Sequence, residues 1–171
     1  MTFGAILKKM RTGYGRGVPD EVAGNARVKY GIIGAMKKIV LEYRVPYADT
    51  DMMGVVYYAN YYVMFERARN ELMRACGYSY KECEAEGWGL PVTHSECDYR
   101  GSAKYDDLLE ISAWVKSMKG VRLEIACEIR RKGEEKPLVS GFTRHCFIDL
   151  KTFRPMPPPG KLAAVIAEGM E

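Results

Sequence analysis

Several features are scarce or absent in this 171-residue sequence, and each absence excludes a class of protein. No apolar run reaches the roughly 18 residues that a helix needs to cross a bilayer, so we expect no membrane span. The five cysteines form no C-x-x-C pair, which argues against a zinc site or a disulfide framework and favours a reduced, cytoplasmic protein. No phosphate-binding loop of the G-x-x-x-x-G-K type occurs, and we expect neither a metal nor a cofactor.

Strong charge is also lacking. The net charge is +4 and 28% of the residues are charged, a mild basic excess that does not indicate a nucleic-acid partner. Such an excess helps to attract a phosphorylated substrate, although an ordinary polar surface explains it equally well. At 47% hydrophobic residues, the chain has enough apolar material for one packed domain.

The first 35 residues differ from the rest of the chain. They contain six basic and two acidic residues, many glycines and little apolar periodicity. We interpret residues 1–35 as a loosely ordered extension and residues 36–171 as the folded domain. A transit peptide is less favoured because this stretch lacks serine. A start of the natural protein at Met36 is a further alternative.

Beyond this stretch, the hydrophobic pattern changes period twice. Alternation over residues 37–45 predicts a strand, and apolar residues at helical spacing from Tyr61 to Ala75 predict a long one-sided helix, with Asn60 as N-cap and Gly77 as the stop. A short helix over 79–86 and strands over 90–99, 109–116, 121–130 and 138–150 follow, with a short helix over 161–168 at the end. Tight turns at Lys119-Gly120 and Lys132-Gly133 predict an antiparallel meander. This order predicts an α+β fold, with one helix packed on an antiparallel sheet.

One segment combines this pattern with chemical groups. Residues 47–69 read YADTDMMGVVYYANYYVMFERAR, with a D-x-D pair, a glycine three residues later, V-V-Y and E-R-A-R inside the helix. Residues 103–107, AKYDD, precede an alternating strand. Together these motifs resemble the signature of the 4-hydroxybenzoyl-CoA thioesterase family, including the acyl-CoA thioesterases encoded beside the Tol–Pal system. The resemblance covers about residues 37–160.

The family resemblance implies a hotdog fold, in which a curved antiparallel β-sheet wraps a long central helix and two chains pair edge to edge. It implies hydrolysis of an acyl-CoA thioester with Asp51 as the catalytic carboxylate. The Tyr58 backbone amide would polarise the thioester carbonyl, because the first amides of a helix are unpaired and lie at its positive end. Gly54 and Asn60 are expected to bind substrate, and so are Arg100 and Lys104, which would contact the phosphates of CoA. The expected assembly is a homodimer or a homotetramer.

Each of these residues also has a structural interpretation. Asp51 is of a type common in turns, Tyr58 and Asn60 suit the start of any helix, and surface cations such as Lys104 are frequent. Asp49 is expected to stabilise the loop through Asx-type hydrogen bonds. Glu66 and Arg69 either line the site or form an exposed ion pair at i, i+3 spacing.

Two other functions remain open on the same fold. A dehydratase acting on acyl carrier substrates would need a histidine near the helix start, whereas His94 and His145 lie on predicted strands and are expected to be structural. A non-catalytic module that binds acyl-CoA would not need a carboxylate beside an anionic ligand. The Tol–Pal-associated branch has histidine at the position of Tyr58 and serine at that of Asn60. This departure leaves the branch and the acyl group open, with short-chain and aromatic acyl groups both compatible.

Overall fold

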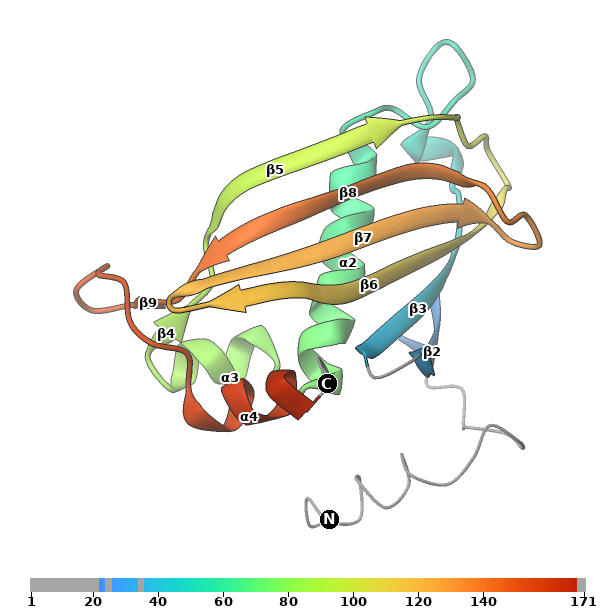
Figure 1. Ribbon diagram of the computed structural model, residues 1–171. Helices are drawn as coiled ribbons and strands as arrows, with labels where there is room; N and C mark the ends of the chain where they lie inside the picture. Colours follow the sequence, from blue (N-terminus) through green and yellow to red (C-terminus); the bar gives the residue numbers. More distant parts are fainter. Residues whose placement is uncertain (1–21, 24–25, 34–35, 169–171) are drawn as a thin grey trace.

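The computed structural model describes residues 22–23, 26–33 and 36–168. Its centre is one antiparallel sheet with the strand order β1-β2-β3-β6-β7-β8-β5 (Figure 1). The strands of this sheet are β1 (Val22–Ala23), β2 (Ala26–Ile33), β3 (Met36–Arg44), β5 (Val92–Tyr99), β6 (Leu108–Lys119), β7 (Arg122–Arg131) and β8 (Pro137–Cys146). Within the described residues, no helix is long and apolar enough to span a membrane.

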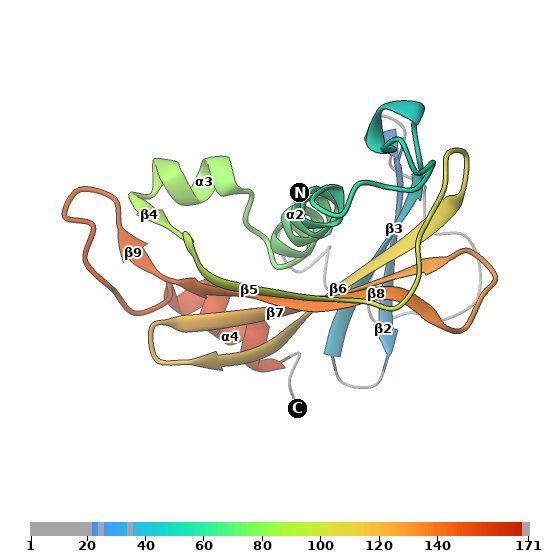
Figure 2. The same cartoon turned by 90° about the horizontal axis from the view of Figure 1, so that it is seen from above.

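Helix α2 (Asn60–Ala75) lies along one face of this sheet (Figure 2). Its buried stripe includes Met64, Phe65, Ala68 and Leu72, each at most 1% exposed, and packs against the inward residues of β3, β6 and β7. Because alternate strand residues point to opposite faces, one face of the sheet supplies this core. The predicted α+β fold is therefore confirmed, and the sheet curves around the helix as the resemblance implies.

The fold also has three short helical elements. The short 3-10 helix η1 (Tyr47–Asp49) lies between β3 and α2, α3 (Tyr80–Ala85) follows α2, and α4 (Gly160–Glu168) ends the described chain. Helix α3 begins at Ser79, whose side chain forms a reciprocal capping box with Glu82. Both short helices lie close to their predicted positions.

Two predicted strands differ from the observed ones: one is shorter than predicted and the other is divided. The strand expected over 90–99 begins at Val92, and the one expected over 138–150 ends at Cys146. The residues beside them form a separate two-stranded sheet, in which β4 (Trp88–Gly89) pairs with β9 (Ile148–Asp149). Periodicity does not detect such a sheet, because each of its strands has only two residues.

The two edges of the main sheet differ. Strand β2, within the predicted extension, pairs with β3 from Ala26 opposite Tyr43 to Ile33 opposite Met36. Residues 1–21, 24–25 and 34–35 of that extension lie outside the described residues, and the domain boundary at residue 36 stays a prediction. At the other edge, β5 pairs with β8 alone among the described strands, and all of its residues except Cys97 are exposed.

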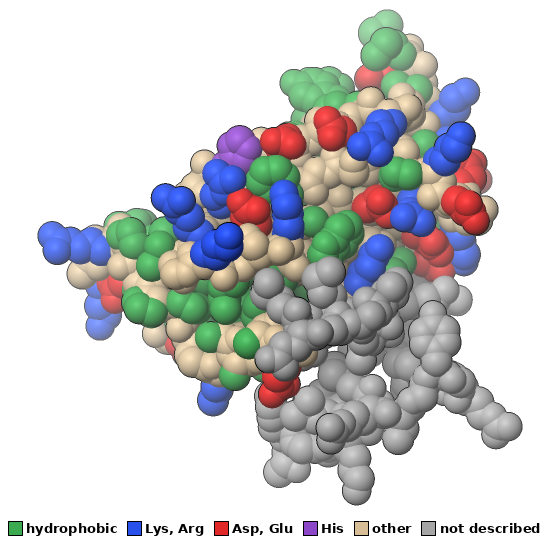
Figure 3. Space-filling model, viewed as in Figure 1, with side chains coloured by type: hydrophobic (Ala, Val, Ile, Leu, Met, Phe, Trp, Pro, Cys, Tyr) green, Lys and Arg blue, Asp and Glu red, His purple; other side chains and the backbone are tan. Residues whose placement is uncertain are grey.

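The face of the sheet turned away from α2 carries many charged side chains. Figure 3 shows basic and acidic side chains interspersed on it with hydrophobic ones. Glu124 on β7 forms ion pairs with Lys116 on β6 at 3.8 Å and with Arg144 on β8 at 2.8 Å. The ammonium group of Lys116 also lies 4.0 Å from the centre of the Phe142 ring. Charges of opposite sign on three adjacent strands are thus paired on this face.

Candidate active site

Asp51 lies in the loop between β3 and α2, in a tight turn. Its backbone amide donates to Val55 (2.9 Å), its carbonyl accepts from Gly54 (2.9 Å), and a bridge between Thr50 and Val56 closes the turn. Its carboxylate oxygen Oδ1 accepts from the Met53 amide at 2.8 Å. Within the described residues, Oδ2 accepts no hydrogen bond. One oxygen therefore fixes the carboxylate and the other is available.

Gly54 is needed here for its backbone conformation. Its φ of +73° is in the left-handed region that residues with a Cβ rarely adopt. A Cβ added at this position would meet no atom within 4 Å, so the space beside it is open. This open space is compatible with the substrate contact that we predicted for Gly54.

Helix α2 begins nine residues after Asp51, at Asn60. Hydrogen bonds occupy the amides of Tyr57 (to Asp49), Asn60 (to Tyr57) and Tyr61 (to Tyr58). The amides of Tyr58 and Ala59 donate to no atom of the described residues. Unpaired amides at a helix start are donors for developing negative charge, and the helix dipole adds to their effect.

Asn60 is not the N-cap, contrary to prediction. It is the first helical residue, and Ala59 occupies the cap position without a side-chain bond. The Asn60 side-chain amide instead donates to the Asp49 carbonyl at 2.9 Å and ties the helix start to the loop. This contact crosses eleven residues, and local sequence does not reveal it.

Asp49 stabilises the loop, but through a different bond from the one predicted. Its Oδ2 accepts from the Tyr43 hydroxyl at 2.6 Å, whereas the Asx-type bond belongs to Asp51. Burial, followed by this hydrogen bond to a carboxylate, raises the pKa of Tyr43 to about 12. Asp49 is thus already engaged, and Asp51 is the more available acid.

Four tyrosines surround the helix start. The ring of Tyr58 lies 4.7 Å from that of Tyr57 and 6.4 Å from that of Tyr99, and the Tyr99 ring lies 5.8 Å from Tyr61. The Tyr99 hydroxyl donates to the Tyr58 carbonyl at 3.3 Å. Tyr57, Tyr58 and Tyr99 are each about half exposed, at 46%, 58% and 46%. Sequence reasoning missed Tyr99, because it is 41 residues away from Tyr58.

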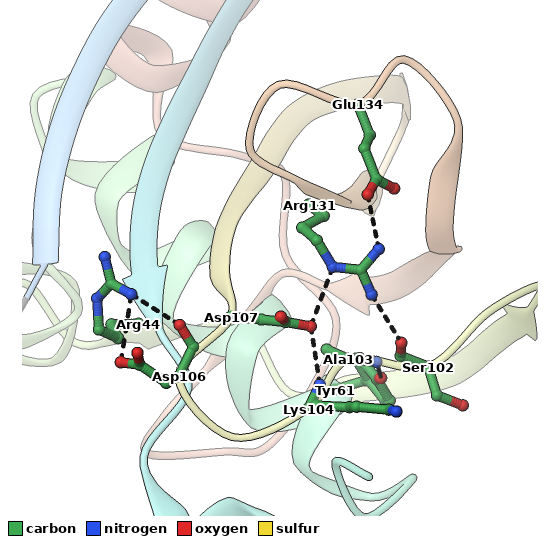
Figure 4. A network of polar contacts seen from close by, with 9 residues as sticks. All are labelled: Arg44, Tyr61, Ser102, Ala103, Lys104, Asp106, Asp107, Arg131 and Glu134. Carbon is green, nitrogen blue, oxygen red and sulfur yellow. Dashed lines mark hydrogen bonds and ion pairs between the residues drawn. The ribbon is translucent and has the colours of Figure 1, made fainter.

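Segment 102–107 lies beside the same loop. Arg100 is two residues before it, and Lys104 lies within it. The Val56 amide donates to the Ala103 carbonyl at 2.8 Å, and the Ala103 amide donates to the Tyr61 hydroxyl at 3.0 Å (Figure 4). Arg100 follows Tyr99, and its exposed side chain lies 3.9 Å from Asp98. Both predicted cations are therefore next to residues bonded to the loop or the helix start.

The two histidines lie away from the helix start. His145 is fully buried, and its Nδ1 donates to the Leu90 carbonyl (3.0 Å). Its Nε2 therefore accepts from the Thr143 hydroxyl (2.8 Å) in the neutral ring. Burial lowers the pKa of His145 to about 4. The ring centre of His94, on β5, lies 5.5 Å from that of Phe142, on β8. These positions fit the predicted structural roles.

The surroundings of Cys83, Cys127 and Arg69 show what these side chains can do. Burial raises the pKa of Cys83 to about 11 and that of Cys127 to about 12, so both thiols stay protonated at neutral pH. The Nε of Arg69 donates to the Tyr80 hydroxyl at 3.3 Å, and Arg69 and Glu66 form no ion pair among the described residues. No group of acids, histidines and cysteines suited to hold a metal ion occurs in the described part of the chain.

The chain is similar in sequence to known proteins. The chain is 34% identical over 122 residues to the acyl-CoA thioesterase YbgC of Haemophilus influenzae, covering 71% of this chain and 88% of that protein. It is 29% identical over 115 residues to the putative acyl-CoA thioesterase YneP of Bacillus subtilis, covering 67% and 83%.

Solved structures extend the comparison to the fold. A DHNA-CoA thioesterase from Staphylococcus aureus aligns with a TM-score of 0.65 at 31% identity, over 69% of this chain and 78% of that one. A 1,4-dihydroxy-2-naphthoyl-CoA thioesterase from Synechocystis aligns with a TM-score of 0.71 at 24% identity, over 76% and 96%. The model of the thioesterase-like superfamily matches residues 45–166, which include the loop, α2 and the whole of β5 to β8. The chain has the hotdog fold and belongs to the thioesterase-like superfamily.

Proposed function

We propose that this protein hydrolyses acyl-CoA thioesters, with short-chain or aromatic acyl groups, and that Asp51 is the catalytic carboxylate. The observation that carries the proposal is that two features lie in one short stretch of chain. The Asp51 carboxylate has one oxygen without a hydrogen bond among the described residues, and the helix start that follows has two amides that lack a partner there. Membership of the superfamily and the names of its relatives support the reaction class.

In this mechanism, the thioester carbonyl oxygen accepts a hydrogen bond from the Tyr58 amide. Asp51 removes a proton from water, and the resulting hydroxide attacks the carbonyl carbon. The C–S bond then breaks, and the CoA thiolate takes the proton from Asp51, which restores the carboxylate. Gly54 leaves room for the acyl group beside the loop, Asn60 holds the helix start, and Arg100 and Lys104 pair with CoA phosphates.

A nucleophilic route uses the same residues. The Asp51 oxygen attacks the carbonyl carbon, the C–S bond breaks with loss of the thiolate, and water hydrolyses the mixed anhydride. The two routes differ in one observable, the mass of the protein after a quenched single turnover. Mass spectrometry detects the protein mass increased by the acyl group in the nucleophilic route, and the unmodified protein mass in the general-base route.

The test of the function is a panel of acetyl-, butyryl-, benzoyl- and 4-hydroxybenzoyl-CoA with detection of free thiol. We expect turnover of at least one member, and a loss of roughly 10²–10⁴-fold in kcat for Asp51→Asn with unchanged thermal unfolding. Asp49→Asn is the matched control two residues away, and we expect a loss of less than about tenfold.

Two outcomes contradict this proposal. Wild-type kcat in Asp51→Asn would remove the catalytic assignment. Tight binding of CoA thioesters with no release of thiol from any of them would favour the non-catalytic module instead.

We further propose that two chains pair through their β5 edges. A strand edge with unpaired backbone groups is a template for another strand, and exposed Val92 and Tyr99 lie on this one. Sedimentation equilibrium is expected to give the mass of two chains, or of four if dimers pair. A single-chain mass at micromolar concentration would overturn this pairing.

A further inference from the structure

One short segment contacts both ends of the loop that carries Asp51. At the beginning of the loop, the Val45 amide donates to the Asp107 carbonyl (3.0 Å), and the Asp106 amide donates to the Val45 carbonyl (3.0 Å). At the end of the loop, Ala103 of the same segment is bonded to Val56 and Tyr61. The position of this segment therefore sets the separation between the two ends of the loop.

This segment does not belong to a helix or strand, and part of it is strained. Residues 102–107 lie between β5 and β6 without regular structure. Asp106 has a φ of +66°, a conformation that costs about 1 kcal/mol or more in a residue with a Cβ. Arg44 holds it through Nη1, which donates to the Asp106 carbonyl at 2.7 Å. Such a segment needs outside contacts to keep one conformation.

Arg131, at the end of β7, provides these contacts at both ends of the segment (Figure 4). Its Nε donates to Asp107 Oδ2 at 3.0 Å, and its Nη2 donates to the Ser102 carbonyl at 3.2 Å. Its Nη1 donates to Glu134 at 2.8 Å, on the turn that follows β7. The guanidinium group thus spans the segment from residue 102 to residue 107.

Asp107 is the central acceptor of this network. Its Oδ2 also accepts from the Lys104 amide at 2.9 Å. Burial alone would raise the pKa of Asp107, but the Lys104 amide and the Arg131 guanidinium outweigh it and lower the pKa below its usual range. The carboxylate therefore stays charged, and its two partners keep the segment closed around Ala103, which is fully buried.

We propose that Arg131 is a positioning residue for the active site: its guanidinium group fixes segment 102–107, and the segment fixes Asp51 relative to the Tyr58 amide. This inference rests on the function proposed above. Arg131 contacts no reacting atom in it. The planar guanidinium makes three bonds in fixed directions, which a lysine ammonium on a flexible stem does not reproduce. Misplacement of a catalytic group by about 1 Å can lower the rate by a factor of about 100.

The test compares Arg131→Lys and Arg131→Gln with the same changes at Arg130. Arg130 is the matched control, because it is the neighbouring residue of β7 and forms an ion pair with Glu128 instead. For both Arg131 variants, we expect kcat to fall about 10- to 100-fold with KM within threefold of wild type. For both Arg130 variants, we expect kcat within twofold of wild type. A purely structural role would lower the melting temperature and the folded fraction, and would leave kcat per folded chain unchanged.

A second measurement does not depend on activity. Hydrogen exchange of the Val56 and Ala103 amides is expected to be at least tenfold faster in Arg131→Gln than in wild type and unchanged in Arg130→Gln. Unchanged protection of both amides in Arg131→Gln overturns the proposal, whether or not the protein hydrolyses any thioester. Loss of activity in Asp51→Asn together with wild-type kcat in Arg131→Gln also overturns it, and leaves the proposed function intact.

Discussion

The two ends of helix α2 are built in opposite ways. At its start, the amides of Tyr58 and Ala59 have no partner within the described residues, and aromatic rings are half exposed. At its end, the amides of Cys76, Gly77 and Tyr78 all donate to carbonyls of the last turns, and Gly77 adopts the left-handed conformation typical of a helix stop. One end leaves hydrogen-bonding capacity for a ligand, and the other uses it within the chain.

The aromatic side chains around the two ends of α2 also differ, because they are buried at one end and partly exposed at the other. Next to the end of α2, Tyr78, Trp88 and Phe147 form a buried aromatic cluster, with ring centres 5.5 Å and 5.9 Å apart for the two pairs that include Trp88. At the start of α2, the rings of Tyr57, Tyr58 and Tyr99 contact neighbouring tyrosines and are also about half exposed. From this difference we expect the end of α2 to stabilise the fold and its start to serve the proposed reaction. Substitutions at the two ends should therefore separate stability from activity.

The largest effect on stability is expected at the buried end. Trp88→Ala removes the central ring of the aromatic cluster, and we expect the free energy of unfolding to fall by roughly 3–5 kcal/mol. Under conditions where the variant is folded, kcat should stay within twofold of wild type. Chemical denaturation together with the thiol assay checks both parts. Phe153→Ala is the control, because Phe153 is 74% exposed in the turn after β9. Its substitution should lower the free energy of unfolding far less.

A loss of kcat in folded Trp88→Ala comparable to that of Asp51→Asn would break the comparison. It would mean that the two ends of α2 are coupled.

A smaller effect, with a defined pH dependence, is expected at His145. The folded state lowers the pKa of His145 to about 4, so the unfolded chain takes up a proton at a higher pH than the folded chain does. The stability that comes from the neutral ring is complete above pH of about 6.5 and is lost as the pH falls towards 4, by on the order of 3 kcal/mol.

Denaturation of wild type and His145→Gln across this pH range checks the prediction. The stability difference between the two proteins should shrink as the pH falls, and kcat at pH 7 should change little. A constant difference would show that His145 takes up its proton equally easily in both states. A large loss of kcat would revive a histidine-dependent reaction.

The long helix, the main strands from β3 onwards and the candidate acid were predictable from sequence, because their signals are local. The helical stripe from Tyr61 to Ala75 and the alternation in β7 reflect burial on one side of each element. Asp51 and Gly54 are recognisable from their order and spacing.

The other contacts of the site depend on residues that are distant in the sequence. Tyr99 touches Tyr58 across 41 residues, and Arg131 reaches Ser102 across 29. The Asn60 side chain bonds back to Asp49, so a residue that local rules assign to a cap has a different role. The expected roles of Arg100 and Lys104 with CoA, and the cytoplasmic location, stay predictions.

Strand β2 has a consequence for how the protein assembles. It covers the edge of β3, and the outermost strand beyond it, β1, has only two residues. Because β2 occupies the edge of β3, that edge is not available to a second chain. Pairing through β5 would use the same edge of both chains, and each β5 edge would then be occupied by one partner. This contact by itself would therefore give a closed pair and not a filament.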